Sequence, residues 1–171
     1  MSAAAHQLIN QTSGEVEYYT PVEIIEAARR VMGRIDLDPA SSENANRIVR
    51  ASRIFTEADD GLAQDWFGKV WMNHPFGLVQ NRKWPTKLER EYFEGRVIEA
   101  CCITYACTSE NWFQILAKHP QCYLTPRTNY RLPDGTIKKG VSKGSVITYH
   151  GSDVEKFANE FRAFGQVKVA V

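Results

Sequence analysis

The sequence VWMNHPFG, at residues 70–77, decides the fold. Three apolar residues end abruptly in a polar one, which is how a buried parallel strand stops at the carboxyl edge of a sheet, where open α/β folds place their ligands. The polar part suits a flat ring that carries an amine, because Asn73 and the peptide oxygen of His74 are hydrogen-bond acceptors. Pro75 stiffens the turn and Phe76 adds a stacking face, although such a motif alone is more often an ordinary loop.

Before this stretch, a helix is predicted to begin at Thr20-Pro21, in the sequence TPVEIIEAARRVMG. Thr20 is the expected cap, Pro21 takes the first helical position, and Gly33 ends the helix. Helical spacing predicts one apolar face, made of Val22, Ile25, Ala28 and Met32.

A short strand at residues 35–38 is predicted to run into the loop sequence DPASS, which starts at Asp38. A carboxylate there can face a cation, while free backbone N–H groups can face an anion. An edge strand at residues 53–56 precedes Asp59-Asp60-Gly61, which predicts a tight turn. Both acidic segments are equally compatible with plain turns, and no GxGxxG sequence indicates a dinucleotide site.

After the central stretch, helices and strands are predicted to alternate. Trp84-Pro85 predicts a helix opening with Leu88 and Tyr92 buried, and residues 97–106 predict a second buried strand. Further predicted elements are a helix from Trp112, strands at 122–124 and 145–149, a helix after Asp153 and a strand at 165–171. We expect the strands at 122–124 and 145–149 to be antiparallel and joined by a long basic loop. The order predicts an α/β fold with a mostly parallel central sheet flanked by helices, and antiparallel strands near the C-terminus.

Composition limits the class of protein. A chain of 171 residues with 43% hydrophobic and 24% charged residues is typical of one soluble globular domain. The net charge of +1 gives no global attraction for nucleic acid, so a DNA site would be a local basic patch, as at residues 127–144. The four cysteines lack CxxC spacing and are expected to be reduced core thiols rather than metal ligands. Neither a signal peptide nor a membrane span is indicated, so we expect a cytoplasmic protein.

Taken in order, these segments resemble the small phage-type DNA N-6-adenine methyltransferases. The shared features are a helix opened by Thr-Pro, a strand ending in LDPAS, the sequence DDGL-x-Q-x-W and the VW-x-Asn-x-Pro-Phe-Gly strand end. Trp112-Phe113 and the Gly-Ser-Val-Ile strand near residue 145 continue the resemblance, which covers roughly residues 17–150. The ordered combination is far more specific than any single motif.

The resemblance implies a single Rossmann-like methyltransferase domain at residues 17–171, without a separate target-recognition domain, after a flexible lead-in at residues 1–16. It implies methyl transfer from S-adenosylmethionine to an adenine flipped out of double-stranded DNA, without a metal. The implied biological role is phage DNA modification that protects against host restriction, in the cytoplasm of a bacterial host if the chain is phage-encoded.

The resemblance also implies which residues carry each role. The catalytic motif would be Asn73, His74, Pro75 and Phe76, with Phe76 stacked on the base. The residues implied for cofactor binding are Tyr19, Thr20, Pro21, Asp38, Pro39, Ala40, Ser41, Asp60 and Asn73. Those expected to contact DNA are Arg82, Lys83, Arg127, Lys138, Lys139 and Lys143.

Two departures from the family pattern stand out. His74 occupies the place of the usual first proline, which keeps the peptide oxygen but loses the fixed φ, so His74→Pro is expected to be tolerated. The segment at residues 106–109 lacks the basic residue that the family commonly has near the threonine. Two other interpretations remain open: a catalytically weak or silent relative that binds nucleic acid or a partner, and a methyltransferase acting on an amine of RNA or protein. The sequence does not indicate the oligomeric state.

Overall fold

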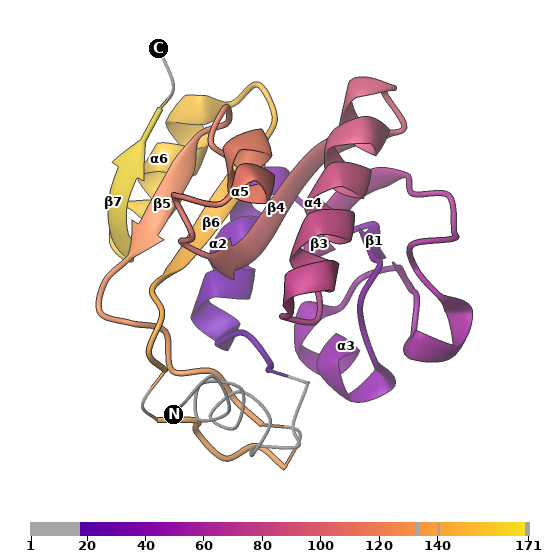
Figure 1. The fold of residues 1–171 in the computed structure, drawn as a ribbon, viewed down its shortest axis with the longest axis horizontal. Coiled ribbons are helices and arrows are strands. Elements are labelled where there is room, and N and C mark those ends of the chain that lie inside the picture. Colours follow the sequence, from indigo (N-terminus) through magenta and orange to yellow (C-terminus); the bar gives the residue numbers. More distant parts are fainter. Residues whose placement is uncertain (1–17, 133, 140, 170–171) are drawn as a thin grey trace, which may run out of the picture.

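A computed structural model of the protein describes residues 18–132, 134–139 and 141–169. The predicted lead-in at residues 1–16 lies outside these ranges. The described chain forms one seven-stranded sheet with helices packed against it (Figure 1). The strands are β1 (Leu37–Asp38), β2 (Arg53–Ile54), β3 (Gly68–Met72), β4 (Val97–Tyr105), β5 (Gln121–Leu124), β6 (Ser145–His150) and β7 (Gly165–Lys168). The helices are α2 (Val22–Met32), α3 (Glu43–Val49), α4 (Leu78–Phe93), α5 (Asn111–Leu116) and α6 (Val154–Phe161), with a 3-10 turn η1 (Glu57–Asp59).

The sheet has the strand order β2-β1-β3-β4-β6-β5-β7. The pairs β2–β1, β1–β3 and β3–β4 are parallel, whereas β6 is antiparallel to both β4 and β5, and β7 is antiparallel to β5. The predicted α/β class, with a mostly parallel core and antiparallel strands toward the C-terminus, is therefore confirmed. From β1 the chain first crosses to β2 on one side and then to β3 on the other. The carboxyl ends of β1 and β3 thus form a topological switch point, where open α/β sheets bind ligands.

The core consists of two layers, one on each face of the sheet. Because successive strand residues face opposite sides, Trp71 packs in the layer of α2 and α6, while its neighbours Val70 and Met72 pack in the layer of α4 and α5. Figure 1 shows α4 and α5 in front of the sheet and α2 behind it. All three residues are essentially inaccessible to solvent, as expected for the buried strand that precedes the central motif.

The start of α2 differs from the sequence prediction. Pro21, rather than Thr20, is the residue before α2, and the Thr20 side chain makes no capping hydrogen bond. Val22, predicted to be buried, is 43% exposed, and Ile24 is buried instead. The buried face of α2 is centred on Ile24, Ala28 and Val31, and at about 100° per residue this leaves Val22 on the side that faces solvent.

Helix α4 begins at Leu78, directly after the central motif and well before the predicted start at Trp84-Pro85. The amide of Asn81 donates to the carbonyl of Gly77, which closes the first turn. Pro85 therefore lies inside the helix, where it cannot donate to the carbonyl of Asn81. Proline is favourable at the first position of a helix, and for that reason the sequence prediction placed the start of this helix at Trp84-Pro85, which is wrong.

The remaining elements lie close to their predicted ranges. Asp153 caps α6 by accepting a hydrogen bond from the amide of Lys156 at 3.0 Å, as predicted. In the connection between β5 and β6, the carboxylate of Asp134 accepts a hydrogen bond from the amide of Thr136 at 2.8 Å. All four cysteines are free thiols, and three of them are buried. Among the described helices none is long and apolar enough to cross a membrane.

Candidate active site

A cavity of about 950 Å³ lies at the β1/β3 switch point. Its wall combines the loop after β1, the loop after β3, the residues before α2 and helix α4 from Gln80 to Arg90. The size is at the upper end of what small-molecule sites usually have, about 300–1,000 Å³. The sequence-predicted residues that line it are Tyr19, Thr20, Asp38, Pro39, Ala40, Ser41, Asp60, Asn73, His74, Pro75, Phe76, Arg82 and Lys83. Five others, Pro21, Arg127, Lys138, Lys139 and Lys143, are not part of the described lining.

Asp38 is a buried carboxylate at the end of β1, with 2% of its surface exposed. Its Oδ1 atom accepts a hydrogen bond from the amide of Ala40 at 3.2 Å, and no ion pair to it is formed within the described ranges. Burial raises the pKa of this carboxyl to about 7, against the weaker opposing effect of hydrogen bonds from Ser41 and Ala40. A carboxylate held this way, on the wall of a cavity, favours a cationic ligand group.

The loop after β1 is held in place by its neighbours along the chain. A side chain at Gly61 would place its Cβ 1.9 Å from the carbonyl oxygen of Pro39, so only glycine allows the 60–61 turn to approach this closely. The preceding residue, Asp60, has a left-handed backbone conformation with φ 49°. The amide of Ser41 also donates to the carbonyl of Phe55 at 2.9 Å. The two acidic turns that sequence reasoning found separately therefore form one wall.

Thr20 contributes a second polar group on that wall. Its side chain is buried, and Oγ1 has no hydrogen-bond partner in the described part of the chain. Buried hydroxyl groups nearly always have a partner, so an unpartnered one beside a cavity points to a ligand atom. The hydroxyl of the adjacent Tyr19 lies 3.2 Å from Oγ of Ser42, which in turn caps α3.

Asn73, at the end of β3, has its amide orientation fixed from outside the loop. Its Nδ2 donates to the backbone carbonyl of Tyr18 at 2.6 Å. Because the amide nitrogen is used in this way, Oδ1 remains the atom that can accept from a ligand. Sequence reasoning identified Asn73 as an acceptor but did not identify Tyr18, whose contribution is a backbone atom and leaves no signal in the side-chain pattern.

His74 is buried, with 1% of its surface exposed. Its Nε2 lies 2.9 Å from Oδ1 of Asn81, and its ring stacks on Trp84 at 6.3 Å and meets the Phe76 ring edge-on at 5.7 Å. Burial lowers the pKa of the imidazole to about 4, partly opposed by the hydrogen bond to Asn81. A neutral ring therefore donates from Nε2 and packs between α4 and the rest of the motif.

Phe76 lies in a group of aromatic rings. Its centroid is 4.3 Å from that of Tyr105, 5.9 Å from Tyr130 and 6.4 Å from Tyr18. Sequence reasoning missed all three tyrosines. Tyr105 could have been found, because it ends the strand next to β3 and parallel to it, at the same sheet edge. Tyr130 comes from the connection between β5 and β6, whose path no sequence pattern indicates.

The predicted DNA-contacting residues fall into two groups. Arg82 and Lys83 are exposed on the first half of α4, at the cavity wall. The other group lies on the connection between β5 and β6, which runs below the sheet in Figure 1. There, Nζ of Lys143 lies 5.4 Å from the centroid of the Tyr105 ring, and Tyr105 packs against Phe76. The connection is thus linked to the loop after β3, although none of its described residues lines the cavity.

Backbone pairing also ties this connection to the residues before α2. The amide of Tyr19 donates to the carbonyl of Arg131 at 2.7 Å, and the amide of Arg131 donates to the carbonyl of Tyr19 at 2.9 Å.

The other basic side chains predicted to contact DNA differ in exposure. Arg127 is exposed and donates to the carbonyl of Val141 at 3.4 Å. Lys139 is exposed and Lys138 is half-buried.

A search among curated proteins finds no match to the chain. The sequence model of one protein family, described as DNA N-6-adenine-methyltransferase (Dam), matches residues 10–147, most of the chain. The match spans both loops of the cavity, α4 and the later strands up to β6. The chain therefore belongs to the DNA N-6-adenine-methyltransferase (Dam) family.

Proposed function

We propose that the protein transfers a methyl group from S-adenosylmethionine to the exocyclic N6 amine of adenine in DNA. Family membership supports adenine methylation in DNA as the general activity. The observation that carries the finer proposal is the lining of a single cavity by both the loop after β1 and the motif after β3. A methyl donor and a methyl acceptor must be held side by side, and this cavity combines an acidic wall with an amine-accepting wall.

The acidic wall suits the cofactor. S-adenosylmethionine supplies an electrophilic methyl group on a sulfonium and also carries an amine and a carboxylate. The carboxylate of Asp38 would pair with the cationic amine, and Oγ1 of Thr20 would gain the hydrogen-bond partner that it lacks within the described chain. Asp60, on the turn packed against Pro39, would face the adenosyl part.

The second wall suits the acceptor base. Oδ1 of Asn73 and the peptide oxygen of His74 would accept hydrogen bonds from the adenine amine and direct its lone pair at the methyl group. The amine nitrogen becomes more positive as the new bond forms, so two fixed acceptors stabilise the transition state more than the ground state. Phe76, supported by the Tyr105 ring, would stack on the base.

The remaining steps concern the duplex. Adenine N6 is unreachable while the base is stacked, so the base must leave the helix before reaction. Arg82 and Lys83 on α4, with the basic side chains of the β5–β6 connection, would hold the phosphates on either side of the flipped nucleotide. Residues 17–171 would act as one catalytic unit, and the biological role that we propose is protection of phage DNA against host restriction.

The experiment is transfer of radiolabelled methyl from S-adenosylmethionine to unmethylated duplex DNA, followed by nucleoside analysis. We expect the label in N6-methyldeoxyadenosine. Matched reactions contain RNA or unrelated protein as acceptor. Label in these acceptors but not in DNA would contradict the proposed substrate. A folded protein that binds S-adenosylmethionine but transfers nothing to any of them would be a silent relative.

A further inference from the structure

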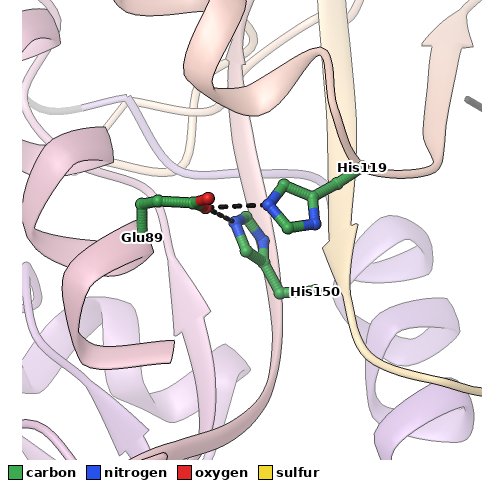
Figure 2. A group of neighbouring side chains, drawn as sticks. All are labelled: Glu89, His119 and His150. Atoms are coloured by element: carbon green, nitrogen blue, oxygen red, sulfur yellow. Dashed lines mark hydrogen bonds and ion pairs between the residues drawn. The ribbon is translucent and has the colours of Figure 1, made fainter. Parts of the chain in front are cut away.

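Outside the cavity, three side chains with metal-binding atoms meet between α4 and the sheet. Figure 2 shows Glu89 of α4 directed at the imidazole rings of His119 and His150. Oε2 of Glu89 lies 2.8 Å from Nε2 of His119 and 3.2 Å from Nε2 of His150. The donor atoms of the three residues all lie within 4.8 Å of one another. They come from a helix, the turn before β5 and the end of β6, so only the fold brings them together.

The spacing is close to that of a tetrahedral metal site. Bonds of about 2.0–2.1 Å from zinc to nitrogen or oxygen place neighbouring ligand atoms about 3.3 Å apart. The two distances from Glu89 differ from this value by about half an ångström or less. A rotation of the side chains, without movement of the backbone, would open a position for an ion between them.

The surroundings also favour an ion over a set of hydrogen bonds. His150 is completely buried, and its Nδ1 has no hydrogen-bond partner among the described residues. The imidazole rings of His119 and His150 overlap, with centroids 3.9 Å apart, so both present nitrogen atoms to one carboxylate oxygen. Tyr92 covers both rings edge-on, at 5.8 Å from His119 and 5.3 Å from His150. The feature that favours an ion is the pair of Nε2 atoms aimed at one carboxylate oxygen, whereas the unpaired Nδ1 of His150 is on the far side of its ring.

We propose that Glu89, His119 and His150 bind a zinc ion. Two imidazole nitrogens and one carboxylate oxygen are ligands that suit Zn²⁺, whereas Mg²⁺ and Ca²⁺ require oxygen ligands. The three protein ligands leave a fourth position for a water molecule. None of the three residues lines the cavity, so the site is independent of the proposed methyl transfer.

The ion would fasten α4 to the sheet. Lys87 and Arg90, on either side of Glu89 in this helix, line the cavity wall, and His150 is the last residue of a central strand. An ion that joins Glu89 to His150 would therefore fix the position of the wall that carries Arg82 and Lys83. Its contribution is to stability, because an ion that binds only the folded state shifts the folding equilibrium by mass action.

The test is calorimetric titration of the chelator-treated full chain with zinc chloride, together with thermal unfolding. We expect saturable binding of one zinc ion per chain and an unfolding midpoint that rises with zinc concentration, but not with magnesium. Glu89→Gln and His119→Gln should each weaken binding by at least about tenfold. These two positions are chosen because their side chains are partly exposed, whereas a variant of His150 risks misfolding.

Cys107→Ser is the matched control, since its half-buried thiol is the accessible one and lies outside the cluster. It should leave zinc affinity unchanged, and cobalt substitution should give the spectrum of a site without thiolate ligands. Folded protein without saturable zinc binding would overturn the proposal. Binding that is abolished in Cys107→Ser but kept in Glu89→Gln would overturn it equally.

Discussion

The loops after β1 and β3 face the same cavity, and each buries one titratable side chain without an opposite charge. In the first loop, burial raises the pKa of Asp38 to about 7. In the second, burial lowers the pKa of His74 to about 4. The charged form is disfavoured in both cases, yet the surroundings differ. Asp38 has hydrogen bonds only from its own loop, whereas His74 is enclosed by Trp84, Phe76 and Asn81.

This difference separates two uses of a buried titratable group. His74 also lines the cavity and its Nδ1 has no partner among the described residues, but its Nε2 is hydrogen-bonded and its ring is packed, so most of the imidazole belongs to the protein's own structure. The carboxylate of Asp38 borders open space and has no cationic partner in the described chain, so it is suited to receive one from a ligand. Perturbed pKa values alone would not tell these uses apart, because structural groups are perturbed as well.

The largest effect is expected at Asn73, the residue before His74. Asn73→Ala removes an acceptor that acts mainly in the transition state, so single-turnover methyl transfer should fall by about a hundredfold or more. The free energy of unfolding should fall only by the worth of the lost hydrogen bond from Nδ2 to the carbonyl of Tyr18, about 1 kcal/mol, because the packed part of the loop remains. Turnover at the wild-type rate would show that the acceptor lies elsewhere.

His74→Pro tests whether the packed loop depends on its imidazole. The peptide oxygen survives, so the sequence alone predicts tolerance, but the structure leads to the opposite expectation. Loss of the ring leaves a space between Trp84 and Phe76 and an unpaired Asn81 side chain, with a destabilisation of about 2–4 kcal/mol. Urea denaturation measures it, with the neighbouring Pro75→Ala as the control for changes in loop stiffness.

The pH dependence of the same variant sharpens the comparison. The pKa of His74 is lower in the folded protein than in the unfolded chain, so protonation favours the unfolded chain. The contribution of the neutral imidazole to the free energy of unfolding is therefore complete above pH 6.5 and is lost as the pH falls through about 4. Wild-type protein should therefore lose part of its stability between these values, and His74→Pro should lack that part. Equal pH slopes in both proteins would contradict a buried neutral imidazole.

Asp38→Asn should act on binding and on stability in opposite directions. The amide keeps the shape of the side chain but cannot pair with a cation, so affinity for S-adenosylmethionine should fall by about tenfold, the magnitude of one hydrogen bond to a charged group. The pKa of Asp38 is higher in the folded protein than in the unfolded chain, so ionisation favours the unfolded chain. The contribution of the protonated carboxyl to the free energy of unfolding is therefore complete below pH 3.8 and is lost as the pH rises through about 7. The variant should thus be more stable than wild type at pH 8, with the advantage disappearing near pH 4.

Calorimetry and thermal unfolding of the ligand-free protein test both parts. Glu57→Gln is the matched control, because this exposed carboxyl lines the same cavity and is assigned no contact with the cofactor. An Asp38→Asn variant that binds the cofactor as tightly as wild type would place the cationic group of the ligand elsewhere.

The smallest effect is expected on the β5–β6 connection. Replacing Lys138, Lys139 and Lys143 by glutamine should lower the slope of log DNA affinity against log salt by about one unit for each phosphate that the protein no longer neutralises. Lys156→Gln, on α6, is the control for net charge. A slope that stays at the wild-type value would mean that the connection is a solvated surface rather than a DNA-binding one.

Sequence reasoning identified the elements that depend on local pattern. The apolar run before Asn73 and the β-branched strand at residues 145–149 depend on side-chain periodicity, and both were found. The start of α4 was missed because Pro85 is favourable at a helix opening and is here tolerated inside the helix. Local signals could not distinguish the two cases.

The parts of the site that sequence reasoning missed depend on contacts between distant segments. The carbonyl of Tyr18 and the ring of Tyr130 reach the loop after β3 from two different segments of the chain. Glu89 and His119 are 30 residues apart in sequence, with a strand and a helix between them. The sheet order decides such contacts, and no spacing rule encodes them.

The pairing between Tyr19 and Arg131 has an evolutionary consequence. Both hydrogen bonds join backbone atoms, and the acceptor that orients Asn73 is a backbone atom as well. Substitution of the side chains at Tyr18, Tyr19 and Arg131 leaves these bonds in place. The β5–β6 connection can therefore change its surface side chains, including the lysines proposed to contact DNA, while the amide of Asn73 keeps its direction. Under the proposed function, DNA contacts on this connection could change in evolution without a matching change in the loop after β3.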